Sequence, residues 1–251
     1  AGRKNSNNAL FPYYTDDKIS ESFEVTGNKS IFHVNKNDKT YLWEPFTKSC
    51  DLVYRNERNL YKNLRGNKII FEEINHDLGI KFSYQWSTCD KYGFIKTSSI
   101  KNLSEQNLSL SILDGFQNIL PWGLDEGIQS STSNLADAYK RNELDFDSKI
   151  GIYALSATIV DRAEPSEALK SNVVFHLGLE SNKVLLSSNQ LDKFRKGHQV
   201  LEELDIKAER GAYFINSDFS LEQNEKKEWL FAADINKSSS DIATLKNEII
   251  T

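Results

Sequence analysis

The chain has 251 residues, of which 39% are hydrophobic, 27% charged and 11% aromatic, a composition typical of ordinary globular proteins. It excludes disordered, collagen-like and membrane-spanning chains, because no apolar run approaches the roughly 18 to 20 residues that cross a bilayer. The net charge of -5, from 31 basic and 36 acidic residues, gives no electrostatic reason to expect a nucleic acid or an anionic membrane as a partner.

The amino-terminal part predicts a polar extension followed by short strands. Residues 1–16 are polar as far as Leu10, and we expect them to precede the folded body. Strands are predicted at 18–25, 30–34 and 40–43, with tight turns between them, because the connecting Gly and Asn residues tolerate positive φ.

A charged stretch comes next and is followed by two alternating segments. Residues 55–66, RNERNLYKNLRG, carry Leu60 and Leu64 four apart, which indicates a loop or one short helix. Segments 68–74 and 78–86 predict a hairpin. The second of them alternates large apolar residues with polar or small ones, so one of its faces should be buried.

The most regular part of the chain, 92–121, predicts two long strands joined by a polar turn. Leu108, Leu110 and Ile112 alternate with serines, the period of two that places one face of a strand on a core and the other in water. Asp114 interrupts this row with a charge.

The second half of the chain adds two helices and more strands. A helix is predicted at 131–144, a strand buried on both faces at 150–160, and a short helix within 189–209. Further strands are expected at 172–179, 184–187, 211–216 and 228–235.

The last residues predict an amphipathic helix. Ser238 and Asp241 have the spacing of a capping box, so the helix should begin here. Ile242, Leu245 and Ile249 then fall on one helical face.

Strands outnumber helices and no internal repeat divides the chain. The sequence therefore predicts a mainly β fold, a large antiparallel two-sheet β-sandwich with a few short helices. We expect an extension at 1–16, the sandwich at 17–236, and at 237–251 the start of a helical linker to a downstream domain. The chain contains no methionine, which also fits a piece of a longer protein.

Motifs for metals and nucleotides are missing from the sequence. The four histidines are scattered without metal-ligand spacing, and neither a Gly-rich phosphate loop nor a GxSxG elbow occurs. We therefore expect no cofactor. Cys50 and Cys89 leave two alternatives, one disulfide or two free thiols.

The loop PWGLDEG at 121–127 is the first candidate site. Trp122 offers an apolar ring face to a sugar, and Asp125 and Glu126 offer acceptors to the sugar hydroxyls. The alternative is a solvated turn in which Trp122 packs against the body.

Asp161, Arg162 and Glu164 form the second candidate site, at a predicted strand end. Two carboxylates in one cleft can serve as acid and base at a glycosidic bond, or they can contact a carbohydrate. The alternative is a structural cluster in which Arg162 pairs with its acidic neighbours.

The segment WSTCDKYGFIKTSSIKNLSEQNLSLSILDGFQNILP, residues 86–121, resembles the amino-terminal β-sandwich of cellobiose-phosphorylase-type glycoside phosphorylases and related hydrolases. In that group one strand reads roughly valine-threonine-leucine-x-Asn-x-Ser, and the stretch Ile100-Lys101-Asn102-Leu103-Ser104 is similar. The resemblance implies a galactose-mutarotase-like supersandwich, followed by a helical linker and an (α/α)6 barrel. It transfers no catalytic residue, because in such enzymes these residues lie in the barrel.

We therefore expect a non-catalytic domain of a carbohydrate-active enzyme, with an oligosaccharide and a downstream catalytic domain as partners. Two alternatives stay open. One is a freestanding mutarotase-like epimerase, for which His176 together with Asp161 or Glu164 is the hint. The other is a structural or adhesion sandwich without a sugar site.

Overall fold

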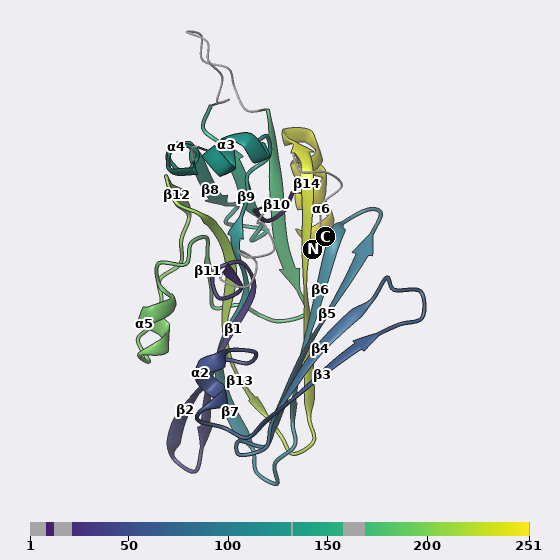
Figure 1. The fold of residues 1–251 in the computed structure, drawn as a ribbon, viewed down its shortest axis with the longest axis vertical. Coiled ribbons are helices and arrows are strands. Elements are labelled where there is room, and N and C mark those ends of the chain that lie inside the picture. Colours follow the sequence, from purple (N-terminus) through teal and green to yellow (C-terminus); the bar gives the residue numbers. More distant parts are fainter. Residues whose placement is uncertain (1–8, 13–21, 132, 158–168, 251) are drawn as a thin grey trace.

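Two antiparallel sheets packed face to face form the body of the chain in the computed structural model (Figure 1). The structure describes residues 9–12, 22–131, 133–157 and 169–250. The predicted mainly β, two-sheet sandwich with a few short helices is confirmed.

The small sheet has five strands in the order β11-β13-β7-β1-β2. Its strands are β1 Gly27–Lys36, β2 Lys39–Trp43, β7 Leu108–Ile119, β11 Lys183–Leu185 and β13 Gly211–Leu221. The large sheet has nine strands in the order β12-β8-β9-β10-β14-β6-β5-β4-β3. Its strands are β3 Asn56–Lys62, β4 Ile69–Asn75, β5 Ile80–Cys89, β6 Gly93–Asn102, β8 Lys140–Leu144, β9 Gly151–Leu155, β10 Lys170–Leu177, β12 Asp205–Lys207 and β14 Lys226–Ser238. The helices are α2 Lys48–Asp51, α3 Glu126–Ser131, α4 Ser133–Ala138, α5 Leu191–Arg195 and α6 Ser239–Ile250.

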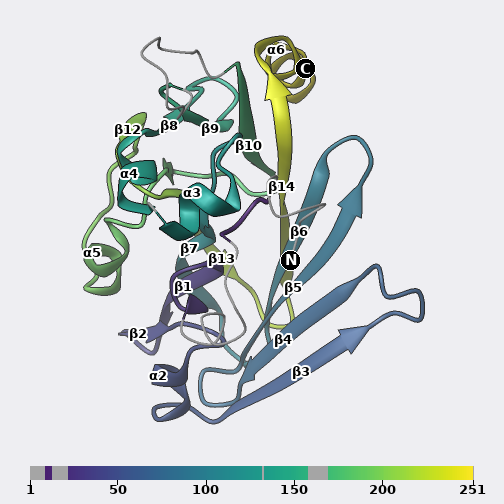
Figure 2. The same cartoon turned by 45° about the horizontal axis from the view of Figure 1, so that its top comes forward.

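The two sheets differ in width, so the small sheet covers only part of the large one. Figures 1 and 2 show strands β3 to β6 diverging from the small sheet toward one side of the molecule. Leu191 and Phe194 of α5 pack on the outer face of the small sheet. No strand of the small sheet therefore covers the inner face of the large sheet where β3 to β5 diverge, within the part of the chain that the structure describes.

The inward-facing row of β5 passes from the core to the surface along a single strand. Ile80 and Phe82 are fully buried between the sheets. Tyr84 and Trp86 continue the row but are partly exposed. The predicted alternation is thus confirmed. The burial of this row decreases toward Trp86 because the two sheets diverge there.

The side chain of Asp114 is fully buried and lies in the inward-facing row of β7. The period of two therefore continues through this position, and only the apolar character of the row is interrupted. The neighbouring residue Gly115 meets strand β13 very closely, because a Cβ at this position would lie 1.8 Å from the carbonyl oxygen of Tyr213. A glycine is therefore required here for the two strands to pair.

The hairpin of β1 and β2 turns at Asn37 and Asp38, whose φ angles are 52° and 57°. Positive φ at both central residues is the geometry that matches the twist of a two-residue hairpin, and Asn and Asp adopt it at low cost. The polar turn predicted here is confirmed.

The prediction for 55–66 is wrong, because Asn56–Lys62 forms the edge strand β3, paired with β4. The spacing of Leu60 and Leu64 imitates a helix, yet both side chains are exposed. Exposed edge strands commonly carry charges that discourage pairing with other chains, and such charge made this segment look like a loop.

The helix predicted at 131–144 is only partly correct. Helix α4 lies within it, but Lys140–Leu144 forms strand β8, with alternating burial. This segment forms a strand because it pairs with β9 and β12, although the spacing of its apolar residues is typical of a helix.

Two strand predictions are also revised. The strand expected at 150–160 is β9, which is fully buried on one face and partly buried on the other. The strand expected at 18–25 is absent at 22–25, where a turn is closed by the amide of Val25 and the carbonyl of Ser22. Residues 158–160 and 18–21 lie outside the described part of the chain.

The predicted carboxy-terminal helix is confirmed as α6. Ser238 Oγ donates to Asp241 Oδ2 at 2.7 Å, and the Asp241 amide donates to Ser238 Oγ at 3.3 Å, which completes a capping motif. Ile242, Leu245 and Ile249 pack against the outer face of the large sheet. The helices of the described residues are too short and too polar to cross a lipid bilayer.

Asn102, in the stretch 100–104 singled out in the sequence, joins two turns at the end of β6. Its Nδ2 donates to the carbonyl oxygens of Gln106, Leu221 and Glu222 at 2.7, 3.2 and 3.1 Å. Its Oδ1 accepts from the amide and hydroxyl of Ser104 at 2.9 and 2.7 Å. The Asn and the Ser of this stretch therefore fasten two turns together, which is a structural role.

Candidate functional site

A groove of about 490 Å³ opens where β4 and β5 diverge from the small sheet. The inner face of these strands forms one wall, and the start of β1 with the loop 45–47 forms the other. A smaller hollow of about 210 Å³ shares Phe11, Ile69 and Trp86 with it. We call this region, lined by both sets of residues, the open groove.

Aromatic rings in fixed mutual positions build the first wall. Phe71 and Tyr84, directly paired across β4 and β5, stack with ring centroids 4.9 Å apart and an interplanar angle of 16°. Trp86 stacks in the same way on Phe116 of the small sheet, at 5.3 Å and 19°. Partly exposed rings of this kind offer flat apolar surfaces to a ligand.

Phe46 closes the groove from the loop, in a backbone conformation that is unusual for a bulky residue. Its φ is 65°, in the left-handed region. The Phe46 amide donates to Glu73 Oε2 at 2.7 Å, and its ring meets Tyr84 edge-on at 5.3 Å. Such strain persists only where the surroundings enforce it, and it is often found at binding sites.

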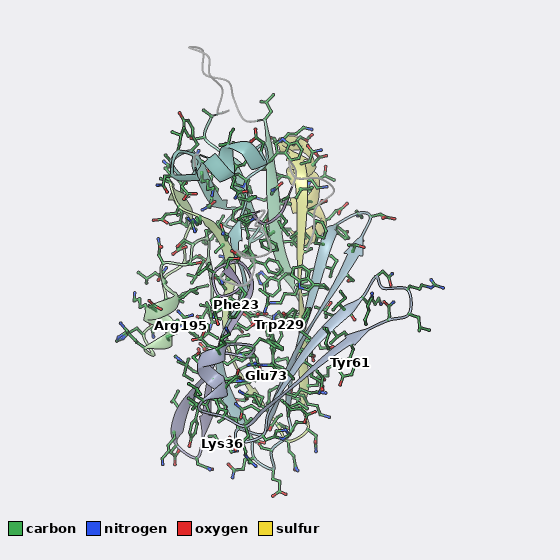
Figure 3. The ribbon with its side chains drawn as sticks, viewed as in Figure 1. Phe23, Lys36, Tyr61, Glu73, Arg195 and Trp229 are labelled. Atoms are coloured by element: carbon green, nitrogen blue, oxygen red, sulfur yellow. The ribbon has the colours of Figure 1, made fainter. Side chains whose placement is uncertain are left out.

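Glu73 fixes this loop from inside the sandwich. The carboxylate is fully buried and also accepts from the indole of Trp43 at 3.0 Å and from Arg58 Nε at 2.6 Å. Arg58 in turn binds the carbonyl oxygen of Thr47 at 3.1 Å. Figure 3 labels Glu73 in the interior below the centre of the molecule.

Two polar groups of the open groove lack partners among the described residues. Asn28 Oδ1 is buried and accepts no hydrogen bond within the described part of the chain. The Tyr84 hydroxyl likewise has no hydrogen-bond partner there, and burial, together with the charge of Asp114, raises the pKa of Tyr84 well above its usual value. The phenol therefore keeps its proton and can donate it to a ligand oxygen.

Charged side chains near the second wall of the groove, formed by the start of β1, form ion pairs with one another. Lys29, whose side chain is 6% exposed, reaches Glu24 at 2.7 Å and Glu44 at 3.1 Å. Arg195 donates to the two carboxylate oxygens of Glu44 from Nε and Nη2, at 2.6 and 3.0 Å, and to Asp192 from Nη1 at 2.6 Å. Burial alone would raise the pKa of Glu44, but Arg195 and Lys29 outweigh it and hold this pKa below its usual value.

A buried ionic network lies beyond the inner end of the groove. Asp114 accepts from Lys96, Ser98 and Trp229 of the large sheet at 2.7, 2.8 and 2.8 Å, and from Ser30 of β1 at 2.6 Å. Burial lowers the pKa of Lys96, and the charge of Asp114 offsets part of this shift. The network links both sheets, and its Lys96 and Asp114 are closed to solvent.

The first predicted site lies at the start of helix α3, which begins at Glu126 and follows Trp122 and Asp125. Neither Trp122 nor Asp125 lines the open groove. Asp125 Oδ1 accepts from the Ile128 amide at 2.7 Å, which caps the helix start. Trp122 is partly exposed, with Lys170 Nζ 5.6 Å from the ring centroid. The side chain of Glu126 is outside the described structure, and the predicted sugar contact of this loop stays a prediction.

The second predicted cluster, Asp161, Arg162 and Glu164, lies outside the described residues. Its predicted carbohydrate contact is therefore carried forward as a prediction.

His176 of β10 is partly exposed, faces Tyr213 of the small sheet, and does not line the open groove. Its Nδ1 is 2.8 Å from the hydroxyl of Tyr213, which itself donates to the carbonyl oxygen of Lys149 at 2.6 Å. This arrangement makes His176 Nδ1–H the donor. Burial, followed by the charge of Lys149, lowers the pKa of His176 to about 4, so the imidazole is neutral near pH 7.

The cysteines are both free thiols, Cys50 buried and Cys89 exposed, so the disulfide alternative is not realised. Among the residues that the structure describes, no group of three or more His, Cys, Asp or Glu side chains could hold a metal ion.

The open groove was not predicted from the sequence. Its aromatic wall was visible as the alternation of β5, but that pattern predicts burial and not exposure. Gly27 and Asn28, which suggested a turn, mark the place where β1 begins, with φ at 84° for Gly27.

Sequence comparison identifies no relatives: no family model matches the chain, and no curated protein matches it. Among solved structures, the chain is similar to a polysaccharide lyase, with a TM-score of 0.55 and 12% identity over 98% of this chain. The chain spans 31% of the length of that lyase. At this identity the similarity shows the fold alone, a β-sandwich that also occurs within a larger enzyme.

Two further structures have lower scores. A putative kojibiose phosphorylase from the human microbiome has a TM-score of 0.44 and 12% identity, over 88% of this chain and 24% of the other. A galactose mutarotase-like protein from Clostridium acetobutylicum has a TM-score of 0.40 and 13% identity, over 89% of this chain and 83% of the other. These TM-scores are too low to establish a shared fold.

Proposed function

We propose that the chain is a non-catalytic β-sandwich domain of a carbohydrate-active enzyme and that the open groove contacts an oligosaccharide. The observation that carries this proposal is the groove itself, in which the stacked rings of Phe71 and Tyr84 face a wall that contains Asn28, whose Oδ1 has no donor among the described residues. Sugar rings need this combination, because their apolar faces stack on aromatic rings while their hydroxyls require donors and acceptors.

The non-catalytic role is supported by the carboxylates near the groove. Among the described residues that line it, Glu24 is the single carboxylate, and it is paired with Lys29. Hydrolysis of a glycosidic bond ordinarily uses two carboxylates that flank the bond. The groove is therefore suited to holding a saccharide for chemistry that takes place elsewhere.

The finer assignment also belongs to this proposal. We infer a galactose-mutarotase-like supersandwich at 17–236 of the cellobiose-phosphorylase type, which packs on a separate (α/α)6 catalytic barrel, with 237–251 as the start of the connecting linker. The resemblance of 86–121 supports it, and so does the similarity to part of a longer lyase. The proposal also includes the carbohydrate contacts predicted from the sequence, at Trp122, Asp125, Glu126, Asp161, Arg162 and Glu164.

Calorimetric titration of the chain with cello- and malto-oligosaccharides tests the proposal. We expect measurable binding that Trp86→Ala weakens by at least about tenfold, as for a central aromatic contact. Phe146→Ala is the matched control, because this ring is 62% exposed and does not line the groove. Absence of binding to every oligosaccharide would reject the proposal and favour a structural sandwich.

An anomerisation assay on glucose and galactose addresses the epimerase alternative. The contact of His176 with Tyr213 disfavours that alternative, because the Nδ1 of the imidazole is already engaged there. A catalytic rate that His176→Ala abolishes would restore it.

A further inference from the structure

The charge pattern around the open groove determines which saccharides it can hold. Lys29 is the only cationic residue among the described residues that line it. Its ammonium is 2.7 Å from Glu24 and 3.1 Å from Glu44, and its side chain is 6% exposed. Arg195 pairs with Glu44 and also with Asp192, so the two cations Lys29 and Arg195 are matched by three carboxylates, Glu24, Glu44 and Asp192.

A sugar carboxylate in this groove would find Lys29 already paired, and a second ammonium, Lys48 Nζ, lies 5.7 Å from the ring centroid of Phe23 and outside the described lining. The sugar carboxylate would lose water on binding against the aromatic wall, and the loss of hydration of a charge is costly unless a cation replaces it. Glu24, whose side chain is 38% exposed, would repel it. Each of these effects opposes a uronate and leaves a neutral ring unaffected.

The unpaired polar groups match neutral hydroxyls instead. Asn28 Oδ1 has no donor among the described residues, and the Tyr84 phenol, whose pKa is raised by burial, is a hydrogen-bond donor near pH 7. Asn28 is paired across the strands with Phe116, on which Trp86 stacks, so the polar and the apolar features adjoin. A sugar hydroxyl can both donate and accept a hydrogen bond, so a neutral saccharide offers the chemistry that these two groups require.

We propose that the open groove selects neutral oligosaccharides and discriminates against uronic-acid oligosaccharides. This inference rests on the proposed function, because it specifies the ligand class of the same site.

The test compares a neutral cello-oligosaccharide with an oligogalacturonate of equal length, titrated into the chain by calorimetry at low and moderate salt. We expect the uronate to bind at least tenfold more weakly. Equal or tighter binding of the uronate overturns the inference and leaves the proposed function intact. Binding of neither ligand rejects the proposed function and the inference with it.

A pair of variants at one position supplies the charge control. Thr26 lines the groove and is partly exposed. Thr26→Lys adds an unpaired ammonium, and Thr26→Gln adds a neutral side chain of similar reach. We expect the Lys variant to bind the uronate at least fivefold better than the Gln variant, with the gain shrinking as salt rises. No difference between the variants contradicts the charge argument.

Tyr84→Phe isolates the hydroxyl from the ring. We expect it to weaken binding of the neutral oligosaccharide severalfold while thermal stability changes little, because the hydroxyl has no partner among the described residues. An unchanged affinity would remove Tyr84 from the proposed contact.

Discussion

Asp114 and Glu73 are buried carboxylates that connect the two sheets, and they differ in how their charge is balanced. Each accepts an indole N–H from the opposite sheet, Asp114 from Trp229 and Glu73 from Trp43. Figure 3 labels Trp229 near the centre of the molecule and Glu73 below it. Lys96, the cation beside Asp114, is fully buried, whereas Arg58, beside Glu73, is 38% exposed.

The difference teaches how one sandwich combines a closed centre with an open end. At the centre, a complete ion pair with additional donors fills the space between the sheets. At the diverging end, the ion pair of Glu73 and Arg58 holds the loop 45–47 at the rim of the groove, and Arg58 stays in contact with water.

The largest expected effect is that of removing Asp114. Asp114→Ala leaves Lys96 buried without its partner, which should lower the free energy of unfolding by about 3–5 kcal/mol. Urea denaturation measures it. Ser30→Ala is the control, since it removes one hydrogen bond to the carboxylate and should cost about 1.5–3 kcal/mol. An equal effect of the two variants would contradict the importance of the ion pair.

Along β5, the cost of truncation should decline toward the groove. Phe82→Ala, in the fully buried part, should lower the free energy of unfolding by about 3–5 kcal/mol. Trp86→Ala should cost only about 1–2 kcal/mol, because part of the ring already contacts water. Denaturation of both variants measures the gradient, and a larger cost at Trp86 would show that this end of the sandwich is closed.

His176 provides a neutral contact between the sheets, and it should make stability depend on pH. Its pKa is lowered to about 4 in the folded chain, so below pH about 6.5 the unfolded chain binds a proton that the folded chain rejects. This contribution to stability is present above pH 6.5 and is lost as pH falls toward 4, with a slope of at most roughly 1.4 kcal/mol per pH unit. Denaturation at several pH values should show a shallower slope for His176→Gln, and an unchanged slope would rule out this assignment.

Arg58→Met should be milder than the loss of Asp114. It removes the cation beside buried Glu73, but solvent already screens this pair, so we expect a loss of about 1–3 kcal/mol. The loop that carries Phe46 should also loosen, which amide hydrogen exchange at residues 45–47 would detect. Unchanged exchange would mean that Glu73 holds the loop without Arg58.

The smallest expected effect is at the loop of Trp122. If this ring adds a sugar contact, Trp122→Ala should weaken oligosaccharide binding by about 0.5–1 kcal/mol, less than the roughly 1.4 kcal/mol of a tenfold loss at Trp86. The titration used for Trp86 measures both. No loss of affinity would leave Trp122 with a packing role only.

The sequence predicted those parts of the fold that depend on local pattern. The alternation of β5, the capping of α6 by Ser238 and the Asn37-Asp38 turn are each visible within a few residues. Residues 55–66 were misassigned because the partners of their charged side chains lie outside the segment. Arg58, for example, pairs with Glu73 of the neighbouring strand.

The open groove could not be predicted in this way. It depends on the angle at which the two sheets diverge and on contacts between distant segments, such as Asn28 with the aromatic wall. Alternation shows that Tyr84 and Trp86 face the same way as Phe82, but it carries no information on whether an opposite sheet covers them.

Strand β3 forms one edge of the large sheet, so its outer side has no neighbouring strand among the described residues. Such an edge is a template on which a second chain can add a strand. Glu57, Arg58 and Lys62 place charge along it, and an incoming strand would have to bury that charge against its own side chains. The charges that made this strand look like a loop in the sequence should therefore also oppose sheet extension by another chain.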